Sequence, residues 1–307
     1  MNISSDAQTL QRAMQLLPNP GISEIAITAP GSGLGYWSGA SSAIADDNHI
    51  YMAYRVRGPI GKGRGYGNCI AKSSDGIHFE HIFTITKEDM DAESLERPSL
   101  IETPDGKWRL YISCSTIGSK HWRIEMLEAD DPSQFNPKSR KTVLPGSQTV
   151  GIKDPVIKYR NNLWHMWATC HPLDQIGQED RMTSQYLTSQ DGVNWAEQST
   201  CLQLRPGMWD SRGARITSLF FTDKDDTIIA YYDGRATAEE NYEERTGIAI
   251  GSSPDSFVAI GDKPFGQSME RKALRYLDIV DLPDNKHRLY YELARLDGSH
   301  ELRTELR

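Results

Sequence analysis

The sequence has few cysteines and lacks long apolar runs. Its four cysteines lie far apart, at Cys69, Cys114, Cys170 and Cys201. They form no Cys-x-x-Cys pair, which argues against a zinc site and a dense disulfide framework. No apolar run reaches the roughly 18 residues of a membrane-spanning helix, and the first residues lack the basic and apolar regions of an export signal. We therefore expect a cytoplasmic protein with reduced thiols and no membrane partner.

Positive charge is also scarce. The 42 acidic and 34 basic residues give a net charge of -8, and no lysine-rich tail is present. Nucleic acid is therefore not an expected partner. Histidines, cysteines and carboxylates show no metal-ligand spacing, and the glycine-rich segments GSGLG and GKGRGYG do not stand between a strand and a helix, as a phosphate cradle requires. We expect no metal and no cofactor.

What the sequence has is a diverged repeat. In five segments an apolar strand, a turn with Asp, Asn or Gly, and an aromatic-rich returning strand follow one another. Equivalent points of the returning strands are Met52, Tyr111, Met166, Tyr231 and Tyr290, which are 55 to 65 residues apart. A regular period of this length is typical of repeat architectures, so the repeat decides the fold prediction.

A second landmark keeps nearly the same period. The segments SSDGIHF, ADDPSQF, SQDGVNW and SSPDSF each combine a tight turn with an aromatic residue, at Phe79, Phe135, Trp195 and Phe257. About four strands in each of five units predict an all-β, five-bladed β-propeller formed by residues 1–307 as a single domain. The expected blades are residues 37–83, 96–137, 152–199, 212–260 and 274–307.

The last unit lacks room for an outermost strand, whereas SEIAITAP near the N-terminus is a strand without a blade. We therefore expect residues 23–30, and Ile25 to Ala29 in particular, to complete the fifth blade and close the ring. A short helix capped by Ser5 or Asp6 is expected over residues 5–17.

In a propeller the first strand of each blade lines the central channel, so the residues at which these strands begin should meet at one end. They are Ser38–Ser41, Glu96–Pro98, Lys153–Pro155, Asp210–Arg215 and Arg275–Asp278. The loops after the second strands add Arg55, Arg57, His121, His171, Asp233, Arg235 and Glu292. Charges gathered in this way must either pair with one another in a salt-bridge lattice or meet a ligand.

A convergent set of carboxylates and guanidiniums in a concave site indicates binding or catalysis. The catalytic candidates are Asp154, Glu96, Asp233 and Glu292. We assign Asp154 as base or nucleophile and Glu96 as acid, a choice that the sequence leaves open. The substrate-binding candidates are Arg97, Arg212, Arg215, Arg235, Arg275, Tyr276, His171, His121, Trp37, Asp210, Asp278 and Arg57. The arginines favour an anionic group on the ligand, and the acid-rich loop in DGRATAEENYEERTG is either a pocket wall or a surface turn.

The Asp154-Pro155 strand beginning in KDPVI and the Ser-x-Asp-Gly-x-x-Trp/Phe blade ends resemble the five-bladed propeller glycosidases, which include family 43 arabinanases and xylosidases, invertases and levansucrases. The resemblance covers all five blades. It implies carboxylates from different blades facing a sugar ring. The first blade, however, has Ala40 where family 43 has its base, and the fourth has Arg212-Gly213-Ala214-Arg215 where that family has its acid.

The leading hypothesis is therefore a glycoside hydrolase-like enzyme whose substrate is a small sugar or glycoside with an anionic group. A glycoside phosphorylase or another non-hydrolytic enzyme on the same scaffold is the second hypothesis. A non-catalytic, carbohydrate-binding or metabolite-binding propeller is the third.

Overall fold

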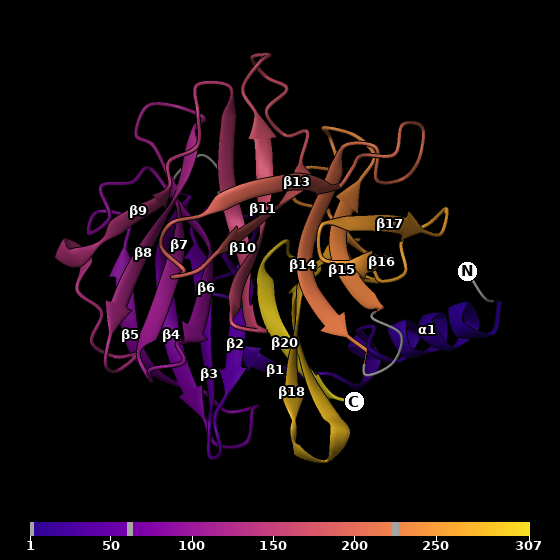
Figure 1. Ribbon diagram of the computed structural model, residues 1–307, viewed down its shortest axis with the longest axis horizontal. Coiled ribbons are helices and arrows are strands. Elements are labelled where there is room, and N and C mark those ends of the chain that lie inside the picture. The colour runs from indigo at the N-terminus through magenta and orange to yellow at the C-terminus, as the bar shows by residue number, and fades with distance from the viewer. Residues whose placement is uncertain (1–2, 60–63, 223–226) are drawn as a thin grey trace.

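Antiparallel strands dominate the computed structural model, which describes residues 3–59, 64–222 and 227–307 (Figure 1). Within these residues there are one α-helix, α1 (Ile3–Gln15), and short 3-10 helices at Pro20–Ile22, Pro137–Ser139 and Pro283–Asn285. No helix in the described part of the chain is long and apolar enough to cross a membrane.

Three sheets have four strands each, and every strand pairs with the next one along the chain. They are β6 (Leu95–Glu102), β7 (Trp108–Ser115), β8 (Trp122–Ala129) and β9 (Lys141–Leu144); β10 (Val150–Arg160), β11 (Leu163–Pro172), β12 (Thr183–Ser189) and β13 (Ala196–Leu202); and β14 (Gly213–Phe221), β15 (Ile228–Arg235), β16 (Arg245–Ser253) and β17 (Ser256–Ile260).

A fourth sheet has eight strands and consists of two groups of four. The first group is β2 (Trp37–Ala45), β3 (Ile50–Arg57), β4 (Gly65–Ser73) and β5 (Glu80–Thr86), and the second is β18 (Leu274–Leu282), β19 (Lys286–Ala294), β20 (His300–Leu306) and β1 (Glu24–Ile27). The two groups share a single parallel bridge, between Trp37 and His300.

The N-terminal segment contains the strand and the helix that the sequence predicts. β1 pairs with β20 through Glu24–Thr304 and Ile25–Arg303. It thus joins the group of strands that the sequence predicts to lack an outermost strand. The helix begins and ends two residues earlier than predicted. The hydroxyl of Tyr231 donates a hydrogen bond of 2.9 Å to the carbonyl of Ala13, which holds the last turns of α1 against β15.

The Ser-x-Asp-Gly segments form tight turns between outer strands. In the turn at Asp191, one carboxylate oxygen accepts hydrogen bonds of 2.8 Å from the backbone N–H groups of Val193 and Asn194. The hydroxyl of Tyr111 in β7 donates to the carbonyl of Gly192 at 2.8 Å and so joins the turn to the neighbouring sheet. The turn at Asp75 repeats this arrangement, and there Tyr290 is the donor.

The first strands of the five groups are β2, β6, β10, β14 and β18, and each has a β-bulge near its beginning. The register shifts lie at Gly39/Ser42, Leu95/Pro98, Lys153/Val156, Ile216/Ser218 and Arg275/Asp278. A bulge bends a strand and re-aims a side chain. Ala40, Asp154 and Tyr276 occupy equivalent bulge positions with φ values of 54°, 52° and 54°, a left-handed conformation that is strained for residues other than glycine.

Replacing Asp191 by alanine should lower the free energy of unfolding by about 1–2 kcal/mol, because two backbone N–H groups lose their acceptor. Urea denaturation measures this change. Asp130→Ala is the matched control, since Asp130 is exposed and has no hydrogen bond or ion pair to the described residues. Equal stability of the two variants would contradict the role of the turn.

Candidate functional site

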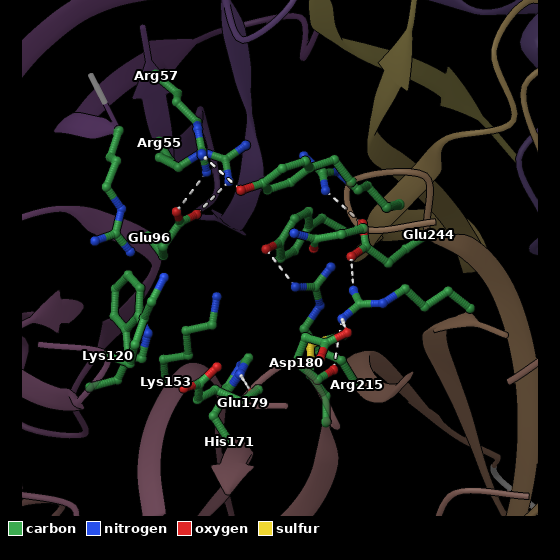
Figure 2. A pocket seen from close by; sticks show the side chains of 18 residues that line it. Arg55, Arg57, Glu96, Lys120, Lys153, His171, Glu179, Asp180, Arg215 and Glu244 are labelled. Carbon is green, nitrogen blue, oxygen red and sulfur yellow. Dashed lines mark hydrogen bonds and ion pairs between the residues drawn. The ribbon is translucent and has the colours of Figure 1, made fainter. Parts of the chain in front are cut away.

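A pocket of about 170 Å³ lies where the first strands begin and the second strands end (Figure 2). The antiparallel hairpins bring these two kinds of chain segment to the same end of the sheets. The pocket is lined by Arg55, Arg57, Arg64, Glu96, Lys120, Trp122, Lys153, His171, Glu179, Asp180, Met182, Arg215, Arg235, Asn241, Tyr242, Glu244, Arg275 and Tyr276.

Buried ion pairs of alternating sign form one side of this pocket. Arg55 of β3 is 2.6 Å from Glu96 of β6 and 2.8 Å from Glu292 of β19. Arg275 of β18 is 2.7 Å from Glu292 and 2.6 Å from Glu244, which lies just before β16. Glu292 therefore bridges two guanidiniums that come from different strands.

The same alternation continues on the far side of Glu244. Glu244 also pairs with Arg235 at the end of β15, and Arg235 is 3.2 Å from Asp180. Asp180 pairs in turn with Arg212 at 2.8 Å. We call this set the alternating-charge arc, and its members in order are Glu96, Arg55, Glu292, Arg275, Glu244, Arg235, Asp180 and Arg212.

The arc keeps its glutamates ionised. Burial raises the pKa of Glu96, Glu244 and Glu292, but the combined attraction of the neighbouring guanidiniums exceeds this effect, so the pKa of each lies below its usual range. Glu96 in particular also accepts from Arg57 at 3.1 Å. As it stands, this residue is an anion and not a proton donor.

The floor of the pocket is built around Tyr276. The guanidinium of Arg215 lies 3.9 Å from the centre of the Tyr276 ring, and its Nη1 donates to the Tyr276 hydroxyl at 2.7 Å. Arg215 also pairs with Asp154 at 3.2 Å and with Asp233 at 2.7 Å. Burial raises the pKa of Asp233 to about 6, although Arg215 opposes this shift.

The opposite side of the pocket has cations with few acidic partners. Arg64 and Lys120 have no carboxylate within 4.0 Å among the described residues, and Lys153 has only Asp154, at 3.4 Å. The ring of Trp122 faces the cations of Arg64, at 5.4 Å, and of Lys153, at 4.8 Å. We call Arg64, Lys120 and Lys153 the open cationic sector. The whole lining has eight arginine or lysine side chains and four carboxylates, in a protein whose net charge is -8.

His171 and Glu179 lie beside this sector (Figure 2). Nδ1 of His171 is 2.8 Å from the carbonyl of Glu179, which can only accept, so Nδ1 carries the proton and Nε2 is an acceptor. Burial, reinforced by Lys153, lowers the pKa of His171 to about 3, which keeps the ring neutral. The Glu179 carboxylate accepts from the backbone N–H of Gly177 at 2.9 Å, and no cation of the described chain lies within 4.0 Å of it.

The structure brings seven of the predicted site residues into the pocket lining and three more directly behind it. The lining residues are Glu96, Arg57, Arg215, Arg235, Arg275, Tyr276 and His171. The residues behind them, Asp154, Asp233 and Glu292, are fully buried and pair with lining arginines or lysine.

Arg97 and Asp278 lie elsewhere. They line a cavity further along the first strands, beyond the bulges. Glu96 and Arg97 are the two residues inside the bulge between Leu95 and Pro98, and they line different cavities. Nη2 of Arg97 donates to the carbonyls of Ser41 and Thr217, at 3.1 and 2.8 Å.

Four other predicted site residues do not line the pocket. Asp210 is occupied by Arg205 and by the hydroxyl of Tyr232, at 2.8 and 2.7 Å. Arg212 is the outer end of the alternating-charge arc, His121 bonds to Thr116 at 2.9 Å, and Trp37 is buried beside a neighbouring pocket.

Loops supply most of the lining residues that strand patterns do not predict. Lys120, Glu179 and Asp180 follow β7 and β11, whereas Asn241, Tyr242 and Glu244 lie in the acid-rich loop after β15. That loop is therefore a pocket wall, and within it Arg245 pairs with Glu240 at 2.7 Å. The described residues contain no group of three His, Cys, Asp or Glu side chains arranged to hold a metal ion.

Comparisons with solved structures relate this fold to propeller glycoside hydrolases. A thermostable family 43 glycoside hydrolase is 12% identical, with a TM-score of 0.68, and the match covers 92% of this chain and 91% of that one. A GH32 β-fructofuranosidase from Bombyx mori is 15% identical, with a TM-score of 0.68, over 100% of this chain and 67% of that one.

A third structure comes from work on the GH130 family of mannoside phosphorylases, which contains glycoside hydrolases that target β-1,2-mannosidic linkages in Candida mannan. It is 19% identical, with a TM-score of 0.61, over 93% of this chain and 91% of that one. No family model and no curated protein sequence matches the chain. At these identities the likeness establishes the fold, which is that of the propeller glycosidases.

Replacing Glu292 by glutamine should destabilise the protein by about 3–5 kcal/mol, because Arg55 and Arg275 would remain buried without their shared carboxylate. Urea unfolding measures the change, with the exposed Glu88→Gln as control. If Glu292→Gln destabilises the protein no more than Glu88→Gln does, the alternating-charge arc contributes little to stability.

Acid should destabilise the protein steeply below about pH 4. Glu96, Glu244 and Glu292 have lowered pKa values in the folded state, so the stability that they contribute is present above the glutamate pKa of the unfolded chain, about 4.3, and is lost as the pH falls further. Urea midpoints measured between pH 7 and pH 3 should fall less in Glu292→Gln than in the wild type. Parallel curves would contradict this prediction.

Proposed function

We propose that this protein is a glycosidase-like enzyme that acts on a small anionic sugar or glycoside bound in the central pocket. The observation that carries the proposal is the excess of cationic over anionic side chains in the lining, within an acidic protein that has a propeller-glycosidase fold. Fixed guanidiniums and ammoniums in a concave site favour a carboxylate, phosphate or sulfonate group on the ligand.

We also infer that the five groups of four strands are the blades of one closed propeller formed by residues 1–307. The first strands contact one another in the cyclic order β2, β6, β10, β14, β18 and back to β2, which supports a ring. In this arrangement β1 is the outermost strand of the fifth blade and closes the ring. The pocket then lies on the propeller axis.

The anionic group of the substrate would bind in the open cationic sector. The arginines of the alternating-charge arc already have carboxylate partners, whereas Arg64 and Lys120 have none among the described residues and Lys153 has one at 3.4 Å. Lys153 is buried and Arg64 is half-buried, and a cation in such a position without a close counter-ion gains most from an anionic ligand. Nε2 of His171, next to Lys153, would accept a hydrogen bond from a sugar hydroxyl.

Two lining carboxylates, Glu96 and Glu179, are the catalytic candidates. Glu96 faces the pocket as an anion, which suits a base, or a group that stabilises a positively charged transition state, better than the acid role assigned from sequence. Asp154, Asp233 and Glu292 would act behind the lining by orienting Lys153 and the arginines. Glu179, a lining carboxylate without a cationic partner, is the candidate proton donor.

Phosphorolysis is the second candidate reaction. In a phosphorylase, inorganic phosphate replaces water as the attacking group. An oxygen of phosphate bonds to the anomeric carbon as the glycosidic bond breaks, which gives a sugar phosphate. A carboxylic acid donates one proton to the oxygen of the leaving group. The open cationic sector supports this alternative because its three cations would attract a free phosphate ion. One of the similar structures comes from a family described as mannoside phosphorylases.

Turnover of a panel of neutral and anionic disaccharides and aryl glycosides tests the proposal, with and without inorganic phosphate. Release of a sugar from anionic glycosides without phosphate is the expected result. Phosphate-dependent release of a sugar phosphate would identify a phosphorylase instead. Binding without turnover, unchanged by Glu96→Gln and Glu179→Gln, would favour the non-catalytic propeller.

Replacing Lys153 by methionine should weaken the binding of glucuronic acid or inorganic phosphate by about tenfold to a hundredfold, because a hydrogen bond to a charged group contributes about 1.5–3 kcal/mol. Isothermal titration calorimetry measures the affinity. Lys141→Met, at an exposed position of the outer strand β9, is the control. If Lys153→Met and Lys120→Ala both bind like the wild type, the anion does not bind in the open cationic sector.

A further inference from the structure

A second pocket adjoins the central one and has a similar volume, about 180 Å³. The two pockets share Asn241 and Tyr242, so these residues form the wall between them. The other lining residues of the second pocket are Leu34, Trp37, Glu239, Glu243, Arg271, Ala273, Ala294, Gly298 and His300. Its lining is not dominated by cations, in contrast to that of the central pocket.

Tyr242 is held firmly between the pockets. Its hydroxyl is 3.3 Å from Nη2 of Arg57, and its ring is 5.0 Å from the ring of Trp37. The Arg57 guanidinium also lies 4.9 Å from the centre of the Tyr242 ring. Tyr242 has a φ of 77°, a strained conformation that the surrounding contacts maintain. These contacts therefore fix the loop after β15 in the conformation that separates the two pockets.

His300 is a buried polar residue in the lining of the second pocket. Its ring stacks on Trp37 at 4.5 Å, and Nδ1 donates to Glu292 at 2.6 Å, so the ring orientation is fixed. Glu292 is ionised and can only accept, so Nδ1 carries the proton and Nε2 has a free lone pair. Burial lowers the pKa of His300 to about 4, although Glu292 opposes the shift, so the ring is neutral at pH 7.

The His300 side chain is only 4% exposed, and no hydrogen bond joins its Nε2 atom to another described residue. Because His300 lines the pocket, this acceptor is available to a donor group of a ligand or to water. A sugar hydroxyl is such a donor. Leu34, which is 53% exposed at the rim, supplies apolar surface next to the charged groups of Glu243 and Arg271, and a sugar ring likewise combines apolar C–H faces with hydroxyl groups.

We propose that this second pocket binds a neutral sugar unit linked to the anionic unit in the central pocket, and that His300 accepts a hydrogen bond from one of its hydroxyls. The substrate is then at least a disaccharide that crosses the wall formed by Asn241 and Tyr242. This inference rests on the proposed function, because it takes the central pocket as the site of the anionic sugar.

Calorimetry with two pairs of probes tests this subsite: glucuronic acid against cellobiouronic acid, and glucose 6-phosphate against cellobiose 6′-phosphate. In at least one pair the disaccharide should bind about tenfold more tightly than its monosaccharide. His300→Asn keeps an N–H near the position of Nδ1 for Glu292 but removes the Nε2 acceptor. It should abolish that advantage and leave monosaccharide affinity within twofold of the wild type.

His78→Asn is the matched control, because the His78 side chain is 85% exposed and pairs with Asp75 alone among the described residues. Leu34→Trp provides a second variant at an exposed position, where it should obstruct the pocket without disturbing the core, and it should reduce disaccharide affinity alone. The inference is overturned if neither disaccharide binds more tightly than its monosaccharide, or if both variants keep the wild-type preference. A disaccharide preference that depends on His300, in a protein without turnover, would support the subsite and refute the enzyme.

Discussion

The pairing of buried guanidiniums with buried carboxylates is the interaction on which the rest of this structure depends. A buried charge without a partner loses several kcal/mol of hydration, and most buried arginines at the strand ends pair with acids that come from other strands or loops. Arg55 joins Glu96 of one sheet to Glu292 of another, and Arg275 joins Glu292 to Glu244. The same contacts therefore connect the sheets and position the pocket wall.

The same ion pairs also distinguish the groups that are available to a ligand from the groups that stabilise the fold. Most arginines of the pocket are neutralised before any ligand arrives, and their orientation is fixed by bonds of 2.6 to 3.2 Å. The open cationic sector, Glu179 and the Nε2 atoms of His171 and His300 are the exceptions. Binding energy is expected from these exceptions, because the paired groups have little left to gain.

The fold and the site are separable in this protein. Its sheets match those of propeller glycosidases, yet the equivalent bulge positions carry Ala40, Glu96, Asp154 and Tyr276, and the Arg215 guanidinium covers the Tyr276 ring in the pocket floor. A propeller fixes where side chains converge. Which chemistry they perform depends on the residues at a few bulges and on the loops around them.

The amino-acid sequence predicts the strands, their period, the turns and the N-terminal strand, because these depend on local alternation and on turn residues such as Asp191 and Gly192. It also placed charges such as Glu96, Arg215 and Arg275 at one end of the sheets. Tertiary structure decided which of them face the ligand. The bulges send Glu96 and Arg97 to different cavities, and Glu179, Tyr242 and His300 come from loops and a distant strand. Local patterns do not encode these placements, because they depend on contacts between residues far apart in the chain.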